Sequence, residues 1–315
     1  MHDLAKFRGV FPPLVTPLSH DESLDLEGLK AVVDFLLAAG VNGLFVLGSS
    51  GEFPYLATDE RLRVAEVVAD EVGGRVPLVL CVSAHSVSEA KRLVDRGREL
   101  GVEAFAAVLP TYFELDPPAV RRFYRDLSGH CEQTPLFAYY FHEIVPASAD
   151  LPPKLVAGLA NEGVLSGLKA STFGWDEYAK PLLDLLKGRE DFVLFAGSEG
   201  LLLKSARANQ LADGLITSPS NHFPRFYVEW FDALRSGDQQ FVESTADLVD
   251  LVVDAYVSAG VLQAPALMKT ALAQLGLPVT TRVRSPLPPL KRLHAKKLSA
   301  LLAAFEERGF LDRWE

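Results

Sequence analysis

Cysteine is scarce in this chain, which has only two among 315 residues. Cys81 and Cys131 lie too far apart in sequence to have a metal-ligand spacing, and so few thiols are typical of a reducing compartment. The first seven residues lack the apolar stretch of a signal peptide, and no apolar run is long enough to cross a bilayer. We therefore expect a cytoplasmic protein that does not associate with membranes.

Basic residues are also in deficit, with 31 Lys and Arg against 41 Asp and Glu, which gives a formal net charge of −10. Recognition of nucleic acid requires a basic surface, so no nucleic-acid partner is expected. His85 and His222 each follow a predicted strand, but no metal-ligand spacing links them, so no metal is expected either. The 49% of hydrophobic and 23% of charged residues indicate a globular chain.

Short apolar runs alternate with longer amphipathic stretches from about residue 8 to about residue 236. Eight runs predict strands: Val10–Thr16, Gly43–Leu47, Pro77–Val82, Ala104–Leu109, Leu136–Tyr140, Val164–Lys169, Phe192–Ala196 and Gly214–Thr217. The stretches between them predict helices that begin near Leu26, Thr58, Ser86, Pro117, Pro152, Gly174, Gly200 and Pro224. Eight such units predict an α/β fold, the (β/α)8 TIM barrel. A doubly wound sheet is less favoured, because no strand is followed by a Gly-x-Gly-x-x-Gly turn.

The strand signals stop after about residue 238, and the remaining sequence predicts helices over about 238–258, 264–275 and 287–308. Pro278 and the proline cluster Ser285–Pro289 separate the last two of these helices. We therefore predict a catalytic barrel over residues 1–236 and a C-terminal helical extension over residues 237–315, packed on the barrel.

Lys169 ends the apolar run Gly163–Lys169, which predicts a buried strand. Lysine is rarely buried without a partner or a use. A lysine that is shielded from water loses proton affinity and becomes nucleophilic near neutral pH. Such an amine can condense with a ketone to form a Schiff base. On the residues alone, Lys169 could equally reach solvent or pair with a carboxylate.

Four further groups of polar residues follow predicted strands, where the chemistry of a barrel gathers. The group Gly48–Glu52 suits a carboxylate through its hydroxyls and N–H groups, although an ordinary turn would also explain it. Of Tyr139 and Tyr140, only one can point inward, where it could exchange a proton with an amine. The groups Ala196–Gly200 and Thr217–Asn221 would bind substrate or cap the helices that follow.

Several motifs, in this order along the chain, resemble those of the dihydrodipicolinate synthase and N-acetylneuraminate lyase family of class I aldolases. The resemblance covers roughly residues 8–300. The motifs are Gly9-Val10 with Val15-Thr16-Pro17, Gly43–Glu52, Leu109–Tyr112, the tyrosine of the fifth strand, Gly167-Leu-Lys169 and Ala212–Ile216. The Gly-Ser-Ser-Gly-Glu element followed at this separation by Gly-Leu-Lys is the specific part of the match.

The resemblance implies a barrel in which Lys169 forms a Schiff base with pyruvate or another 2-oxo acid, without an organic cofactor or a metal. It implies that Ser49 and Ser50 hold the α-carboxylate of this acid. It also implies that Tyr139, four residues after the proline of the fifth strand, relays protons. Tyr140 is the alternative relay residue.

Other predicted substrate contacts come from the groups after the seventh and eighth strands, namely Gly197, Glu199 and Ser218. The resemblance implies a further relay residue, because Tyr112 matches a tyrosine that some members contribute to a neighbouring subunit. A homodimer or a homotetramer is accordingly expected.

Two departures from the family pattern bear on the substrate. The turn at Phe141–Pro146 is two residues longer than usual, and Ser148 stands nearest to the arginine by which dihydrodipicolinate synthases grip their second substrate. Glu199 matches the first of two adjacent acids in sialic-acid lyases, but Gly200 replaces the second. We expect the longer turn to set specificity.

Together these observations predict a Schiff-base lyase that cleaves or forms a carbon–carbon bond next to pyruvate or a related 2-oxo acid, on a sugar-acid-like or other substrate. Two alternatives keep the imine: a dehydratase of a 2-keto-3-deoxy sugar acid, and a condensing enzyme of the dihydrodipicolinate synthase type. A third is a catalytically idle barrel with a binding or regulatory role, since a fold does not imply a function.

Overall fold

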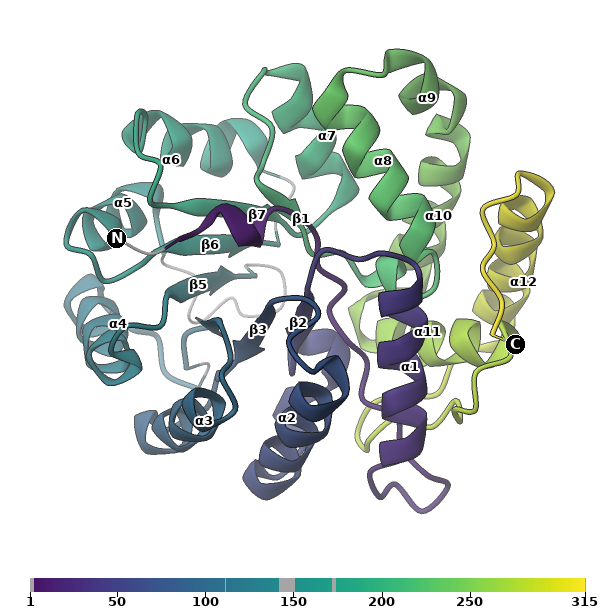
Figure 1. Ribbon diagram of the computed structural model, residues 1–315, viewed down its shortest axis with the longest axis horizontal. Coiled ribbons are helices and arrows are strands. Elements are labelled where there is room, and N and C mark those ends of the chain that lie inside the picture. The colour runs from purple at the N-terminus through teal and green to yellow at the C-terminus, as the bar shows by residue number, and fades with distance from the viewer. Residues whose placement is uncertain (1–2, 111, 142–150, 172–173, 315) are drawn as a thin grey trace. The chain divides into compact units, whose positions relative to one another are not determined.

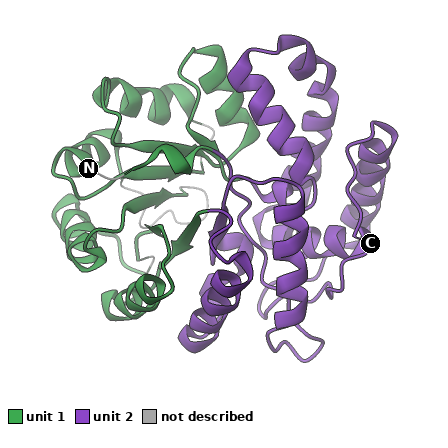
Figure 2. Ribbon diagram, in the orientation of Figure 1, with its two compact units in different colours: residues 1–8, 77–216 green, residues 9–76, 217–315 purple. Residues whose placement is uncertain are grey.

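The computed structural model describes residues 3–110, 112–141, 151–171 and 174–314. Within these residues, strands and helices alternate along the chain in the predicted order (Figure 1). The chain forms two compact units, one made of residues 1–8 and 77–216 and the other of residues 9–76 and 217–315 (Figure 2). The predicted boundary between the barrel and its extension, at residue 236, stays a prediction.

Among its described residues, the first unit contains six parallel strands that pair with one another in chain order. They are β3 (Leu78–Cys81), β4 (Ala104–Ala107), β5 (Leu136–Tyr140), β6 (Gly167–Ala170), β7 (Val193–Ala196) and β8 (Gly214–Leu215). Helical segments connect them: α3 (Val87–Glu99), α4 (Pro117–Cys131), α5 (Pro153–Asn161), a π-helix (Trp175–Ala179) continuous with α6 (Lys180–Leu185), and α7 (Glu199–Arg207). This is the repeated strand–helix pattern that the sequence predicts.

Aromatic side chains form a buried cluster in the first unit. The ring of Phe137 on β5 lies 5.2 Å from that of Phe7 and 5.9 Å from that of Phe195 on β7, measured between centroids. Phe105 on β4 lies on the other face of the strands, because a Cβ added to Gly97 of α3 would come within 2.5 Å of its ring. Alternate residues of a strand therefore face either the interior or the helices.

The second unit contains two short strands and most of the C-terminal helices. The strands are β1 (Gly9–Val10) and β2 (Leu44–Val46), and the helices are α1 (Leu26–Ala38), α2 (Thr58–Val72), α8 (Pro224–Ser236), α9 (Gln239–Ser244), α10 (Ala246–Ala259), α11 (Ala264–Gln274) and α12 (Arg292–Glu307). Strand β1 is shorter than predicted, because Pro12 and Pro13 have no N–H group to donate. After β1, individual hydrogen bonds continue the pairing with β2. They run from Leu14 N to Phe45 O (2.9 Å) and from Phe45 N to Pro12 O (3.0 Å).

Two predicted helices of this unit differ from the observed ones. The predicted helix 238–258 is broken at Thr245, where the hydroxyls of Ser244 and Thr245 both donate to the carbonyl of Phe241 (2.9 Å each). Such local bonds compete with the helical ladder. The last helix begins only at Arg292, because residues that precede a proline avoid the helical conformation.

The predicted sixth strand, Val164–Lys169, is also shifted in the structure, where β6 spans Gly167–Ala170. The N–H groups of Val164 and Leu165 donate to the carbonyl of Leu159 and so close the end of α5. Lys169 is consequently the third residue of β6, with Ala170 after it. The seventh helix begins at Glu199, one residue before the predicted start.

Among the residues that the structure describes, no single helix has the length and apolar composition to cross a bilayer. The segments Ala246–Ala259 and Val261–Gln274 would pass together by length and composition only, and they meet at 98°. Both segments bury apolar residues inside the protein, among them Val252 and Leu267. Their apolar character therefore has an ordinary explanation in packing.

Candidate active site

Lys169 is buried on β6 in the first unit, with 4% of its surface exposed. Strands β5 and β6 pair in a register that sets Tyr139 opposite Lys169. Residues opposite each other on paired strands point to the same face, and the Nζ atom of Lys169 lies 4.1 Å from the centroid of the Tyr139 ring. One unit thus brings together the two residues that were predicted to be catalytic.

Burial controls the protonation of Lys169. Loss of water around the ammonium group lowers the pKa of Lys169 from 10.5 to about 7, and Cys81 opposes this shift to a smaller extent. A substantial fraction of the side chain is then a neutral amine near neutral pH. This is the form that attacks a carbonyl carbon, so the protonation state fits the predicted Schiff-base chemistry.

Strand alternation separates the two candidate tyrosines of β5. Tyr139 is buried on the side of Phe137 and Lys169. Tyr140 instead stacks on Tyr178 of the π-helix, with ring centroids 4.2 Å apart and an interplanar angle of 8°. Tyr140 therefore packs against the helical layer, and Tyr139 is the tyrosine beside the lysine.

The segment after β7 places two further predicted residues, Gly197 and Glu199, in the first unit. A Cβ at Gly197 would lie 2.4 Å from Ser171 Oγ and 2.8 Å from Ala170 O, so close packing against the end of β6 requires glycine here. Glu199 is buried in the first turn of α7, where the helix dipole favours a negative charge. Packing accounts for Gly197, whereas Glu199 is a buried carboxyl group at a strand end.

The serine pair lies in the second unit, where Ser49–Gly51 forms a single 3-10 turn after β2, called here the serine turn. The Ser50 hydroxyl is 3.1 Å from that of Ser218, and Ser50 is 8% exposed. A Cβ at Gly51 would lie 3.0 Å from Leu14 O, which leaves no room for a side chain. The structure thus brings Ser50 and Ser218, from two separate predicted groups, into contact.

The remaining polar residues of the Thr217–Asn221 group have structural partners. The Asn221 amide donates to the carbonyls of Pro13 and Ser218 (3.0 Å each), and the Ser220 hydroxyl donates to Thr217 O (2.6 Å). Both side chains are fully buried. They hold the segment that carries Ser218 but do not cap the helix that follows, since α8 has no side-chain cap at its N-terminus.

Tyr112 is far from buried, with 81% of its surface exposed, and its ring meets that of the equally exposed Phe113 edge-on at 4.9 Å. The turn predicted to set specificity, Phe141–Pro146, lies outside the described residues except for Phe141, and Ser148 also lies outside them. Across the described ranges, no group of three or more His, Cys, Asp or Glu side chains could hold a metal ion.

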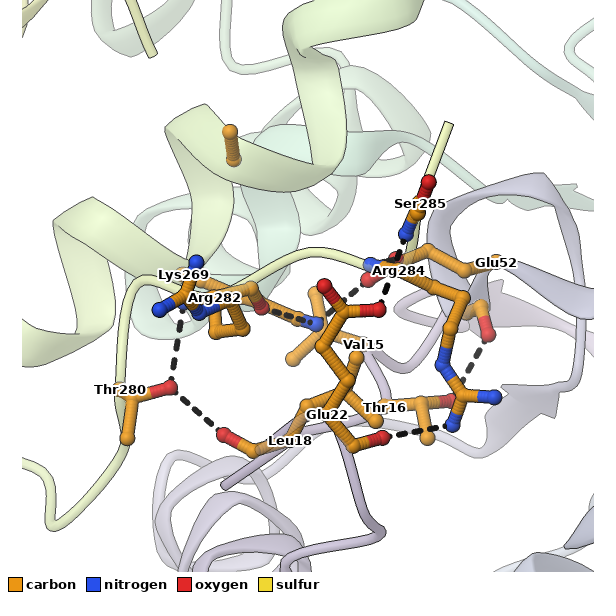
Figure 3. A network of polar contacts seen from close by, with 12 residues as sticks. Val15, Thr16, Leu18, Glu22, Glu52, Lys269, Thr280, Arg282, Arg284 and Ser285 are labelled. Carbon is orange, nitrogen blue, oxygen red and sulfur yellow. Dashed lines mark hydrogen bonds and ion pairs between the residues drawn. The ribbon is translucent and has the colours of Figure 1, made fainter. Parts of the chain in front are cut away.

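A second buried lysine was not predicted from the sequence. Lys269 on α11 is fully buried, and its Nζ lies 2.5 Å from Oε1 of Glu52, the residue that follows the serine turn (Figure 3). The signal in the sequence was a single charged residue, Lys269, in the segment Ala264–Ala273, which is otherwise apolar except for Thr270. Its partner, 217 positions away, could not be found from spacing.

The alternation of parallel strands and helices defines the fold class of the protein, the (β/α)8 barrel. Residues 6–305 match the model of the dihydrodipicolinate synthetase family, and the chain belongs to that family. Its relatives carry the names of lyases and aldolases, so the protein is a class I lyase or aldolase of this family.

Two curated relatives and one solved structure illustrate the likeness. "Probable 2-dehydro-3-deoxy-D-pentonate aldolase YjhH" of Escherichia coli (strain K12) is 29% identical over 314 residues, 96% of this chain and 98% of the relative. An N-acetylneuraminate lyase of Citrobacter koseri is 28% identical over 305 residues, 96% and 98% of the two chains. The crystal structure of YagE, a prophage protein of the dihydrodipicolinic acid synthase family from E. coli K12 in complex with pyruvate, has a TM-score of 0.86 at 26% identity and covers 95% of this chain and 99% of its own. This likeness confirms the predicted (β/α)8 barrel with C-terminal helices.

Proposed function

We propose that the protein is a Schiff-base aldolase that cleaves or forms a carbon–carbon bond next to the pyruvate unit of a 2-oxo acid. The observation that carries this proposal is Lys169, buried on β6 against the ring of Tyr139, with its pKa lowered to about 7 by burial. The neutral amine adds to the 2-oxo carbonyl, and loss of water gives a protonated imine. The imine accepts the electron pair of the C3–C4 bond as an enamine, or returns it to form that bond. This chemistry requires neither a metal nor an organic cofactor.

In this proposal the other site residues bind the substrate and move protons. Tyr139 relays the proton of the C4 hydroxyl: its phenol oxygen accepts this proton as the bond breaks while its own O–H proton passes to water, and the transfers run in reverse when the bond forms. The hydroxyls and N–H groups of Ser49 and Ser50 bind the α-carboxylate of the 2-oxo acid, and the contact with Ser218 orients Ser50. Glu199 accepts a hydrogen bond from a hydroxyl further along the substrate, near the backbone at Gly197.

The substrate class that we favour is a 2-keto-3-deoxy sugar acid. The buried carboxyl group of Glu199 suits a hydroxylated chain, because an ionised carboxylate only accepts hydrogen bonds. The name of the E. coli relative YjhH points to the same class of acid. Ser148, which stands nearest to the carboxylate-gripping arginine of dihydrodipicolinate synthases, disfavours a condensing enzyme of that type.

Borohydride reduction in the presence of pyruvate tests the imine directly. We expect a stable adduct on Lys169, identified by mass spectrometry of its peptide. The initial rate of imine formation should rise with pH through about 7, since only the neutral amine adds. A folded protein that yields no adduct with pyruvate would count decisively against the proposal.

The same imine can lead to two kinds of product, and product analysis separates them. With a 2-keto-3-deoxy sugar acid, release of pyruvate indicates an aldolase. Loss of water without pyruvate indicates a dehydratase, in which the enamine expels a hydroxyl group. An idle barrel would turn over no such acid, and its Lys169→Ala variant would bind pyruvate as well as the parent does.

Substitution of the two tyrosines tests the assignment of the relay. Tyr139→Phe removes only the hydroxyl and should lower kcat by about 10²- to 10³-fold, as for loss of a general acid–base group. Tyr140→Phe, whose ring packs on Tyr178, should change kcat by less than about threefold. Steady-state kinetics with the best sugar-acid substrate measures both. The opposite ranking of the two variants would assign the relay to Tyr140.

We also infer a homodimer or a homotetramer, in which Tyr112 reaches the site of a neighbouring subunit. The large exposed area of Tyr112 and Phe113 supports this, because exposed aromatic side chains are enriched where proteins associate. Both residues lie in the segment between β4 and α4 of the first unit. This segment follows the C-terminal end of β4, and the substrates of barrel enzymes bind at that end of the strands.

A further inference from the structure

A deeply buried ion pair directly follows the serine turn in the second unit (Figure 3). Glu52 and Lys269 have 1% and 0% of their side chains exposed. Burial lowers the pKa of Lys269, and the attraction of Glu52 opposes that shift. The removal of two charges from water costs about as much as their attraction returns, so such a pair is weak evidence for a gain in stability. A role in fixing local geometry explains it better.

Glu52 holds the serine turn through both its backbone and its side chain. Its N–H donates to Ser49 O (3.1 Å) and closes the turn, while its backbone has a left-handed conformation with φ 60°. This conformation is uncommon for a residue with a side chain. The carboxylate is anchored at both oxygens, since Oε1 meets Lys269 and Oε2 accepts from the N–H of Arg284 (2.7 Å).

The partners of Glu52 are themselves fixed. Lys269 also donates to the carbonyl of Arg282 (2.8 Å), and its helix α11 packs against the serine turn. The guanidinium of Arg284 binds both carboxylate oxygens of Glu60 (2.7 and 3.1 Å) and the carbonyl of Glu22 (2.8 Å). Two residues distant in sequence from Glu52, Lys269 and Arg284, therefore hold its carboxylate, and each of them is fixed by further contacts.

The serine turn also has contacts other than those of Glu52, among them the hydrogen bond from Gly51 N–H to Gly48 O (3.0 Å). The Thr16 hydroxyl donates to Gly51 O (2.8 Å), and the hydroxyls of Ser50 and Ser218 meet at 3.1 Å. Closure of the turn at Glu52 is one of the constraints on the direction of the Ser49 and Ser50 hydroxyls and N–H groups, because the N–H of Glu52 bonds to Ser49 O.

We propose that Glu52 and Lys269 are positioning residues, which hold the serine turn in the geometry that binds the carboxylate of the 2-oxo acid. This inference rests on the proposed function. It assigns the ion pair to recognition of the carboxylate and gives it no part in formation of the imine at Lys169. Loss of the pair should therefore weaken binding of ketones that carry a carboxylate and leave other ketones unaffected.

The double variant Glu52→Gln/Lys269→Met tests this prediction. It removes both charges together, so that no unpaired charge stays buried. Borohydride trapping on Lys169 is measured against concentration for pyruvate and for acetone, a ketone without a carboxylate. We expect the pyruvate concentration for half-maximal trapping to rise roughly 10- to 100-fold, the effect of a small misplacement of binding groups. The acetone concentration for half-maximal trapping should stay within about threefold of the value for the parent protein.

A matched control is the ion pair Arg225–Asp312, which lies in the same unit with Nε and Oδ1 2.8 Å apart. The variant Arg225→Met/Asp312→Asn should trap both ketones as the parent does. If the Glu52→Gln/Lys269→Met protein does not fold, Glu52→Asp replaces it. This variant keeps the charge, shortens the side chain by one methylene and should show the same loss confined to pyruvate.

If trapping of pyruvate and of acetone is weakened equally in a folded variant, the substitution has damaged the site as a whole and the inference is overturned. Unchanged trapping of both ketones would also overturn it. In either case the parent still traps pyruvate on Lys169, so the proposed function stands. If the parent traps neither ketone, the proposed function itself fails and the inference falls with it.

Discussion

Replacement of Lys169 by alanine is expected to abolish the borohydride-trapped adduct and to lower kcat by about 10⁵-fold, the scale observed when a covalent nucleophile is removed. The reason is that the imine accepts the electrons of the breaking bond, and no other described lysine lies buried on a strand of the first unit. Turnover is measured by release of pyruvate from a 2-keto-3-deoxy sugar acid, and the adduct by mass spectrometry of the Lys169 peptide.

A solvent-exposed lysine of the same protein provides the control for this result. Lys154 on α5 is exposed, so Lys154→Ala should keep both the adduct and kcat. Circular dichroism must show that the Lys169→Ala protein is folded. An adduct that persists in this variant, on another lysine and with undiminished turnover, would disprove the assignment of Lys169.

Lys169→Met is expected to stabilise the folded protein, most strongly at acid pH. The pKa of Lys169 falls from 10.5 in water to about 7 in the folded state, so between these values the unfolded chain binds more protons than the folded one. The stability of the parent therefore rises as pH rises from 7 to 10.5. Below pH 7 it bears the full penalty of a buried charge, which is about 5 kcal/mol at most for a shift of this size. Methionine carries no charge and avoids the penalty.

Urea unfolding at pH 6, 8 and 10 measures this effect as the difference in the free energy of unfolding between variant and parent. The difference should be largest at pH 6 and should shrink steadily toward pH 10. Lys154→Met, at an exposed position, should show no such trend. A constant difference across the three pH values would mean that packing of the apolar methionine side chain, and no proton linkage, causes the stabilisation.

The order of strands and helices was predictable because each element carries its own hydrophobic period. The predicted bounds of helices and strands were wrong where local side-chain hydrogen bonds, or the missing N–H group of proline, interrupt the element. Two adjacent hydroxyls at Ser244 and Thr245 divide a predicted helix, and Pro12 and Pro13 shorten the first strand. The division of the chain into units made of separate segments depends on long-range contacts, which no local pattern reports.

The candidate site was predictable in the parts that depend on strand ends. Lys169 and Tyr139 were both assigned to such ends, and the register of β5 and β6 brings them together. Glu52 was part of a predicted group, but its partner Lys269 was missed because an ion pair between residues on separate elements leaves no spacing in the sequence. A lone lysine in an apolar helix is the signal to look for.

The register of β5 and β6 also limits how such an enzyme can change during evolution. A slip of one residue would turn every side chain of a strand to its opposite face and would part Tyr139 from Lys169. The segments that follow the strands carry no such restriction, since insertions there leave the main-chain pairing intact. In the proposed lyase, insertions in such segments can change which acid is bound while the paired strands keep Tyr139 beside Lys169.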